Sequence, residues 1–142
     1  MGRGVRIACR ALVTGRAAGG VLVLDEPLSF WGGVDPATGS VIDPHHPQRG
    51  ARLTGRVTVL PSGRGSSSSS SVLAEAIRAG TAPAAIVLAE PDPILALGAI
   101  AARELYGTVV PVVVVDRDGY RLATAAETLR VDGNTVELDL PA

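Results

Sequence analysis

The sequence predicts a mixed α/β domain in which a central βαβαβ unit is flanked by β-strands from both ends of the chain. Three observations support this prediction. Short apolar runs alternate with two helical periodicities between residues 56 and 115. The segments on either side read as strands separated by turn residues. The length of 142 residues fits one domain, so we expect residues 1–142 to form a single unit.

Two β-like runs open the chain. They cover residues 5–14 and 21–28, and the glycine-rich residues 15–20 between them are typical of a turn. Residues 30–50 have no regular period and hold the only Phe, the only Trp and both His. Compact domains seldom keep so long an irregular loop without a use for it, so we expect this loop to be functional.

Three apolar runs in the middle of the chain read as strands. Residues 56–60 (RVTVL) form the first and end at Pro61, and residues 84–89 (AAIVLA) form the second. Residues 109–115 are nearly all apolar, which is typical of a parallel strand covered on both faces. Pro111 indicates that this third strand lies at an edge of the sheet or begins late.

Two helices alternate with these strands. Apolar side chains in residues 72–77 share one face of a short helix that stops near Gly80, which suits a left-handed C-terminal position. Asp92 is placed to cap a second helix whose first turn contains a proline. The 3.6-residue apolar period continues through residues 94–105, and Gly107 ends the helix.

The end of the chain returns to β-like alternation. Residues 121–140 alternate, and Asp132-Gly133-Asn134 reads as a hairpin turn. Right-handed crossovers place the three central strands side by side and parallel. We therefore expect a mixed sheet or a barrel-like β layer built from both ends of the chain.

Charge and composition exclude several classes of protein. The formal net charge is −1, which argues against a nucleic-acid binder that neutralises phosphates. All 13 basic residues are Arg, so lysine chemistry such as a Schiff base is excluded. Cys9 is the only cysteine, so this chain alone cannot hold an iron–sulfur cluster, and we assign it no metal ligand. No apolar run approaches the ~20 residues of a membrane span, and we expect a cytoplasmic protein.

The strongest candidate for a site is the segment of residues 61–67 (PSGRGSS), which leaves a strand and enters a helix. Its glycines allow a tight turn and a close approach to a ligand, and the free amides and dipole of the helix favour an anion. Arg64 adds a planar cation suited to carboxylate or phosphate. Ser66 and Ser67 add hydroxyls. A glycine turn followed by a serine N-cap explains the same residues equally well.

Five motifs resemble, in order, the small subunit of the aconitase X family. They are residues 27–36 (PLSFWGGVDP), His46-Pro47, residues 60–66 (LPSGRGS), Glu90-Pro91 and residues 93–100 (PILALGAI). The resemblance covers about residues 5–115. It implies a swivel domain, which is a three-layer β/β/α module built around the central βαβαβ unit.

The resemblance also implies an activity. The chain would be the small subunit of a two-subunit hydro-lyase that dehydrates a β-hydroxy acid. A cysteine-bearing large subunit would hold an iron–sulfur cluster, so this chain alone would bind no cofactor. Bacterial members resemble cis-3-hydroxy-L-proline dehydratases and archaeal members resemble mevalonate 5-phosphate dehydratases. The lysine-free, nearly neutral composition favours the bacterial substrate.

The resemblance implies roles for individual residues. The serine directly after the Gly-Arg-Gly turn is the proton-abstracting base of the family, and this position is Ser66. The residues expected to shape the substrate site are Ser62, Gly63, Arg64, Gly65 and Ser67.

Two functions of other classes remain open. Swivel folds also occur as carriers that move a phosphorylated histidine between active sites, and His45 or His46 would then be the working residue. Alternatively, the chain is a non-catalytic module whose glycine loop holds a small anion.

Overall fold

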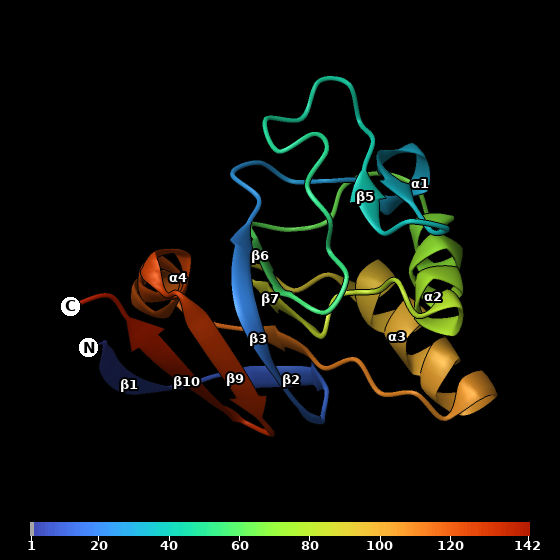
Figure 1. Ribbon diagram of the computed structural model, residues 1–142. Coiled ribbons are helices and arrows are strands. Elements are labelled where there is room, and N and C mark those ends of the chain that lie inside the picture. Colours follow the sequence, from blue (N-terminus) through green and yellow to red (C-terminus); the bar gives the residue numbers. More distant parts are fainter. Residues whose placement is uncertain (1) are drawn as a thin grey trace.

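An eight-stranded sheet forms the frame of the computed structural model, which describes residues 2–142 (Figure 1). The strand order is β1-β10-β9-β3-β6-β7-β8-β2. The strands are β1 (Arg3–Ala8), β2 (Arg10–Val13), β3 (Arg16–Val23), β6 (Val57–Leu60), β7 (Ala85–Leu88), β8 (Val112–Val114), β9 (Thr128–Asp132) and β10 (Thr135–Leu140). β1 and β2 are consecutive in sequence but lie at opposite ends of this order, so the sheet curls. The predicted barrel-like β layer is confirmed.

The sheet has a parallel half and an antiparallel half. Strands β3, β6, β7 and β8 are parallel to one another, as the crossover rule predicts for the central three. Strands β1, β10, β9 and β3 are antiparallel, and Arg3 of β1 pairs with Leu140 of β10. Pro111 delays the start of β8 to Val112, and β8 lies between β7 and β2 rather than at an edge.

Helices α2 (Ser69–Ala79) and α3 (Pro93–Tyr106) end at the predicted glycines, and α3 also begins at its predicted cap. The serine N-cap expected directly after the turn is not found for α2, because the side chain of its N-cap residue, Ser68, makes no capping hydrogen bond. The side chain of Asp92 accepts hydrogen bonds from the amides of Ile94 and Leu95, at 2.9 and 3.1 Å. Gly80 and Gly107 adopt left-handed φ angles of 79° and 71°, which end the two helices.

Two apolar cores separate three layers. One core lies between the two helices and the parallel strands, and it includes Leu60, Leu73, Ile86, Leu88 and Leu95. The other lies between the parallel and antiparallel strands, and it includes Val57, Val59, Val87, Leu129 and Leu138. Strands β6 and β7 are buried on both faces, which explains why their residues do not alternate between apolar and polar. The predicted three-layer β/β/α arrangement is confirmed.

The predicted turn at residues 15–20 is wrong for most of its length. Residues 16–20 belong to β3, and this strand ends at Val23 rather than at residue 28. Gly19 does not turn the chain. A Cβ at this position would lie 2.7 Å from the carbonyl oxygen of Gly55, so the glycine permits two backbones to approach closely.

The sequence pattern also missed a helix. Residues 117–125 form α4 (Arg117–Ala125), although the alternation from residue 121 predicted a strand. Asp116 caps this helix by accepting a hydrogen bond from the amide of Gly119 at 2.7 Å. The hairpin turn at Gly133 is confirmed between β9 and β10.

Buried apolar side chains anchor the irregular stretch of residues 30–50 to the core. It contains α1 (Phe30–Gly33), β4 (Val34–Asp35) and β5 (Ser40–Val41), each of four residues or fewer. Phe30, Val34 and Val41 are buried. None of the helices in residues 2–142 has the length and apolar character needed to cross a membrane.

Candidate functional site

Three segments meet at the carboxyl ends of the parallel strands. Residues 61–68 connect β6 to α2, and the carbonyl oxygen of Pro61 accepts hydrogen bonds from the amides of Ala89 and Glu90, both at 3.1 Å. Gly63 also forms an isolated parallel bridge with Leu28. This edge is where open α/β sheets tend to bind ligands.

A cavity of about 80 Å³ lies where these segments meet. It is lined by Leu28, Gly63, Arg64, Gly65, Ser69, Asp92, Ile94 and Leu95. Three residues of the predicted Gly-Arg-Gly turn therefore line one cavity. Ser62, Ser66 and Ser67 belong to the same loop but are not part of its lining, so their predicted roles stay predictions.

The two glycines of the turn are required for different reasons. Gly65 has a φ of 78°, which is the left-handed region that favours glycine. Gly63 lies against a carboxylate. A Cβ at Gly63 would collide with Oδ2 of Asp92 and would come within 3.3 Å of Leu95. The missing side chain thus lets the loop contact the start of α3.

The serines after the turn differ in their contacts. The Oγ atom of Ser66, a half-buried residue, accepts a hydrogen bond from the amide of Ser68 at 3.1 Å, just before α2 begins. Ser69 is buried, and its Oγ atom accepts a hydrogen bond from the amide of Trp31 at 3.1 Å. Ser67 and Ser68 are exposed. Ser66 is therefore the serine whose oxygen is bonded to an amide at the helix start.

Charge in the cavity comes from two side chains. Arg64 is exposed and takes part in none of the ion pairs found within residues 2–142. Asp92 is only 8% exposed. The pattern Asp-Pro before an apolar helix predicted the cap but not the second contact of Asp92 with Gly63, because that contact joins distant parts of the chain.

The histidines of the loop have separate environments. The ring of His46 is buried, and its Nε2 lies 3.1 Å from the carbonyl oxygen of Glu26. Its Nδ1 accepts a hydrogen bond from the amide of Gln48 at 3.1 Å. Both nitrogens of His46 are therefore engaged, whereas His45 is exposed. Of the two residues considered for a phosphohistidine carrier, only His45 has the accessibility that this chemistry requires.

The donor set of this chain does not fit an iron–sulfur cluster. Cys9 lies between β1 and β2, where its Sγ atom is 3.6 Å from the carbonyl oxygen of Gly133. Burial raises the pKa of this thiol. Across residues 2–142, no three His, Cys, Asp or Glu side chains gather in a way that could hold a metal ion.

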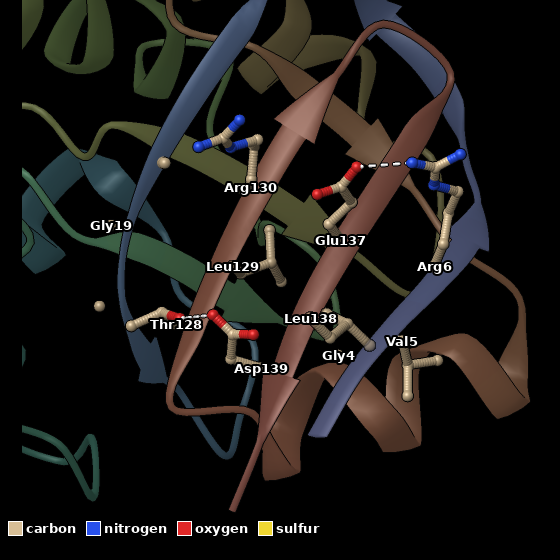
Figure 2. A pocket seen from close by; sticks show the side chains of 12 residues that line it. Gly4, Val5, Arg6, Gly19, Thr128, Leu129, Arg130, Glu137, Leu138 and Asp139 are labelled. Atoms are coloured by element: carbon tan, nitrogen blue, oxygen red, sulfur yellow. Dashed lines mark hydrogen bonds and ion pairs between the residues drawn. The ribbon is translucent and has the colours of Figure 1, made fainter. Parts of the chain in front are cut away.

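A second hollow, of about 650 Å³, lies on the face of β1, β10, β9 and β3 (Figure 2). The sequence pattern did not indicate it. Glu137 pairs with Arg6 at 3.0 Å, and Asp139 accepts a hydrogen bond from the hydroxyl of Thr128 at 2.7 Å. Arg130 also lines this hollow. The carboxylates here are satisfied by neighbouring strands.

The layered fold and the Gly-Arg-Gly loop define a swivel-type α/β domain with a polar cavity at a strand-to-helix turn. The family model described as "Aconitase X swivel domain" matches residues 6–139. The chain belongs to the aconitase X swivel domain family.

Three relatives illustrate the match. Over 106 residues the chain is 57% identical to the cis-3-hydroxy-L-proline dehydratase of Pseudomonas aeruginosa, which corresponds to 75% of the chain but only 18% of that protein. It is 36% identical to the phosphomevalonate dehydratase small subunit of Pyrococcus furiosus, over 97% of both chains. The crystal structure of Thermococcus kodakaraensis aconitase X in its holo form matches with a TM-score of 0.81 at 35% identity, and the match covers 96% of this chain and 99% of that one.

Proposed function

We propose that residues 1–142 act as one domain, the small subunit of a two-subunit hydro-lyase in the cytoplasm. The enzyme removes water from a β-hydroxy acid, and its substrate is cis-3-hydroxy-L-proline; mevalonate 5-phosphate is the second candidate. The dehydratase names of the relatives support the reaction class. The cysteine-bearing large subunit holds the iron–sulfur cluster, and no residue of this chain is assigned to it.

Ser66 takes the proton from the carbon next to the substrate carboxylate. The C–H bond breaks, its electron pair forms the new C=C bond, and hydroxide leaves the β-carbon. The observation that supports this role is the hydrogen bond from the Ser68 amide to the Oγ atom of Ser66. A serine oxygen can act as a base only where its negative charge is stabilised. Here the Ser68 amide donates a hydrogen bond to this oxygen, and the positive end of the α2 dipole adds a favourable electrostatic interaction.

The rest of the turn binds and orients the acid. The Arg64 guanidinium matches a carboxylate in geometry and charge. Gly63 and Gly65 bring backbone close to the ligand, while Ser62 and Ser67 shape the loop around it. Arg64 is the one cation of the cavity lining. A phosphorylated substrate carries more negative charge than one arginine compensates, which favours cis-3-hydroxy-L-proline.

The test compares two neighbouring serines in the complex with the large subunit. Ser66→Ala removes the proposed base, and we expect turnover to fall about 10³-fold, as is typical for the loss of a general base. Ser68→Ala is the matched control, because the Ser68 side chain makes no capping hydrogen bond. Its turnover should stay within about threefold of the parent.

Complex formation is measured in the same samples by size-exclusion chromatography. Both variants should elute with the large subunit, since neither change alters the loop backbone. A Ser66→Ala complex that keeps turnover within a few-fold of the parent contradicts the proposal.

A further inference from the structure

The mechanism proposed above leaves one carboxylate oxygen of the cavity without a role. Oδ1 of Asp92 accepts both capping hydrogen bonds of α3, from the amides of Ile94 and Leu95. Oδ2 lies against the Cα of Gly63, which offers no N–H or O–H donor there. Within residues 2–142, Oδ2 accepts no hydrogen bond.

A carboxylate oxygen without a hydrogen-bond partner in the described part of the chain, such as Oδ2 of Asp92, costs free energy where solvent is scarce, and a nearby cation offsets that cost. Asp92 is 92% removed from solvent, since its exposed fraction is 8%. Buried carboxylates are normally paired or hydrogen-bonded, because charge is poorly solvated away from water. Oδ1 of Asp92 is occupied by the capping amides of α3, and Gly63 lies against one side of Oδ2. Oδ2 is not among the fully buried, unpartnered side-chain atoms of residues 2–142, so it keeps accessible surface, and it faces the cavity that Asp92 lines. Water, or an N–H group of a ligand that displaces the water, can donate a hydrogen bond to Oδ2 there.

The cavity therefore presents charges of both signs to a ligand. Arg64 and the loop amides favour an anion, and Oδ2 of Asp92 favours a cation or an N–H donor. An amino acid carries both groups on one carbon atom. In cis-3-hydroxy-L-proline these are the carboxylate and the ring ammonium, whereas mevalonate 5-phosphate has no cation.

The size of the cavity agrees with such a head group. A volume of about 80 Å³ accommodates a few water-sized groups, given roughly 30 Å³ per water in the liquid. It suits the carboxylate and ammonium of a ligand rather than the whole molecule.

We propose that Oδ2 of Asp92 accepts a hydrogen bond from the ring ammonium of the substrate. Asp92 is then a specificity-determining residue that selects a zwitterion over a hydroxy acid without nitrogen. This inference rests on the proposed function and narrows its substrate class to amino acids.

The experiment measures ligand binding to the complex with the large subunit by calorimetry. The probes are L-proline and tetrahydrofuran-2-carboxylate, in which oxygen replaces the ring nitrogen. The parent should bind L-proline at least about tenfold more tightly, as expected for a charge-assisted hydrogen bond. In Asp92→Asn an NH₂ group stands at one oxygen position, and the preference should fall to within about threefold.

Two further variants separate recognition from folding. Asp116→Asn changes the same type of cap on α4, away from the cavity lining, and should keep the preference for L-proline. Asp92→Ser keeps a capping oxygen and removes the second one, so it should lose the preference as Asp92→Asn does. An Asp92→Asn complex that keeps the tenfold preference, or that weakens both probes equally, overturns the inference.

Turnover of cis-3-hydroxy-L-proline in the same complexes reports on the proposed function separately. If the parent turns over cis-3-hydroxy-L-proline but Asp92→Asn still prefers L-proline, only the proposed role of Asp92 is overturned. No turnover by the parent, together with a preference that Asp92→Asn abolishes, overturns the proposed dehydration and supports a zwitterion site at Asp92.

Discussion

The cavity beside Gly63 and the hollow on the antiparallel face differ in size and in how their carboxylates are satisfied. The hollow is about 650 Å³, and its Glu137 and Asp139 side chains already have partners on neighbouring strands. The cavity is only about 80 Å³, yet Oδ2 of its carboxylate, Asp92, accepts no hydrogen bond from the described residues. Within residues 2–142, both regions contain an arginine without an ion pair, Arg64 in the cavity and Arg130 in the hollow, so the difference lies in the carboxylates. Unfilled hydrogen-bonding capacity marks a candidate site better than volume does.

The difference follows from the two kinds of strand pairing. Antiparallel neighbours place residues directly opposite one another, so Arg6 and Glu137 meet in register. Parallel strands instead end at a common edge, where loops converge with their amides free. Residues 61–68 meet the start of α3 at that edge. The three predictions below test this contrast, beginning with the largest expected effect.

Gly63→Ala and Gly20→Ala place the same methyl group in the two regions. At Gly63 the methyl collides with the Asp92 carboxylate, so the loop must move. We expect a loss of about 1–3 kcal/mol in the free energy of unfolding. We also expect at least about a 100-fold loss of turnover in the complex, because a shift of about 1 Å misplaces the catalytic groups. Denaturant titration and steady-state kinetics measure the two effects.

Gly20 lines the wide hollow, and a Cβ there would meet no atom within 4 Å. Gly20→Ala should leave turnover unchanged and stabilise the protein by up to about 1 kcal/mol, because it restricts the unfolded chain. If Gly63→Ala and Gly20→Ala changed stability and turnover equally, the cavity and the hollow would not differ in the way proposed here.

Ser69→Ala tests the anchoring of the cavity wall. It removes the acceptor for the Trp31 amide and the 3.3 Å contact between the hydroxyls of Ser29 and Ser69. We expect a loss of about 1 kcal/mol in stability, the usual net value of a hydrogen bond. Ser71→Ala is the matched control, since Ser71 is exposed in the same helix turn and alanine favours helix. Thermal unfolding in which the two variants coincide contradicts the anchoring role.

Glu137→Ala should have the smallest effect of the three. The Arg6–Glu137 pair is solvent-exposed, with side-chain accessibilities of 73% and 47%. Exposed pairs contribute about 0–1 kcal/mol and are screened by salt. The difference in urea midpoint between variant and parent should shrink further in about 1 M salt, where the Debye length is about 3 Å. A large, salt-independent loss would mean that the hollow has a structural role of its own.

The elements that the sequence predicted well carry their signals locally. The period of α3, its Asp92 cap and its Gly107 terminus all lie within one helix. Short runs of β-branched and aliphatic residues identified β6 and β7, and both strands are buried on both faces. Gly19 was misread because its reason lies in the distant carbonyl of Gly55. Helix α4 was missed because its sequence is short and contains a glycine, although its Asp116 cap and its amphipathic pattern were signals of a helix.

In the candidate site, too, features with local sequence signals could be predicted and contacts between distant segments could not. Residues 61–67 could be identified from their glycines, their arginine and their place between a strand and a helix. The second contact of Asp92 and the anchoring bond of Ser69 could not, since each joins segments that are remote in sequence. The six consecutive serines from Ser66 to Ser71 cannot be distinguished by residue type, and only their contacts in the folded structure separate them.

The pairing of Arg3 with Leu140 puts the two chain ends side by side. In Figure 1 both ends lie near α4, while α2 and α3 lie on the other side of the molecule. A dye, a surface tether or a short covalent bridge can therefore be attached at either end without covering the Gly-Arg-Gly turn. A circular permutant with joined ends and a new break in an exposed loop remote from that turn would leave the edge that carries the turn intact. Fluorophores placed near Arg3 and Leu140 would test whether this domain changes its orientation in the proposed complex.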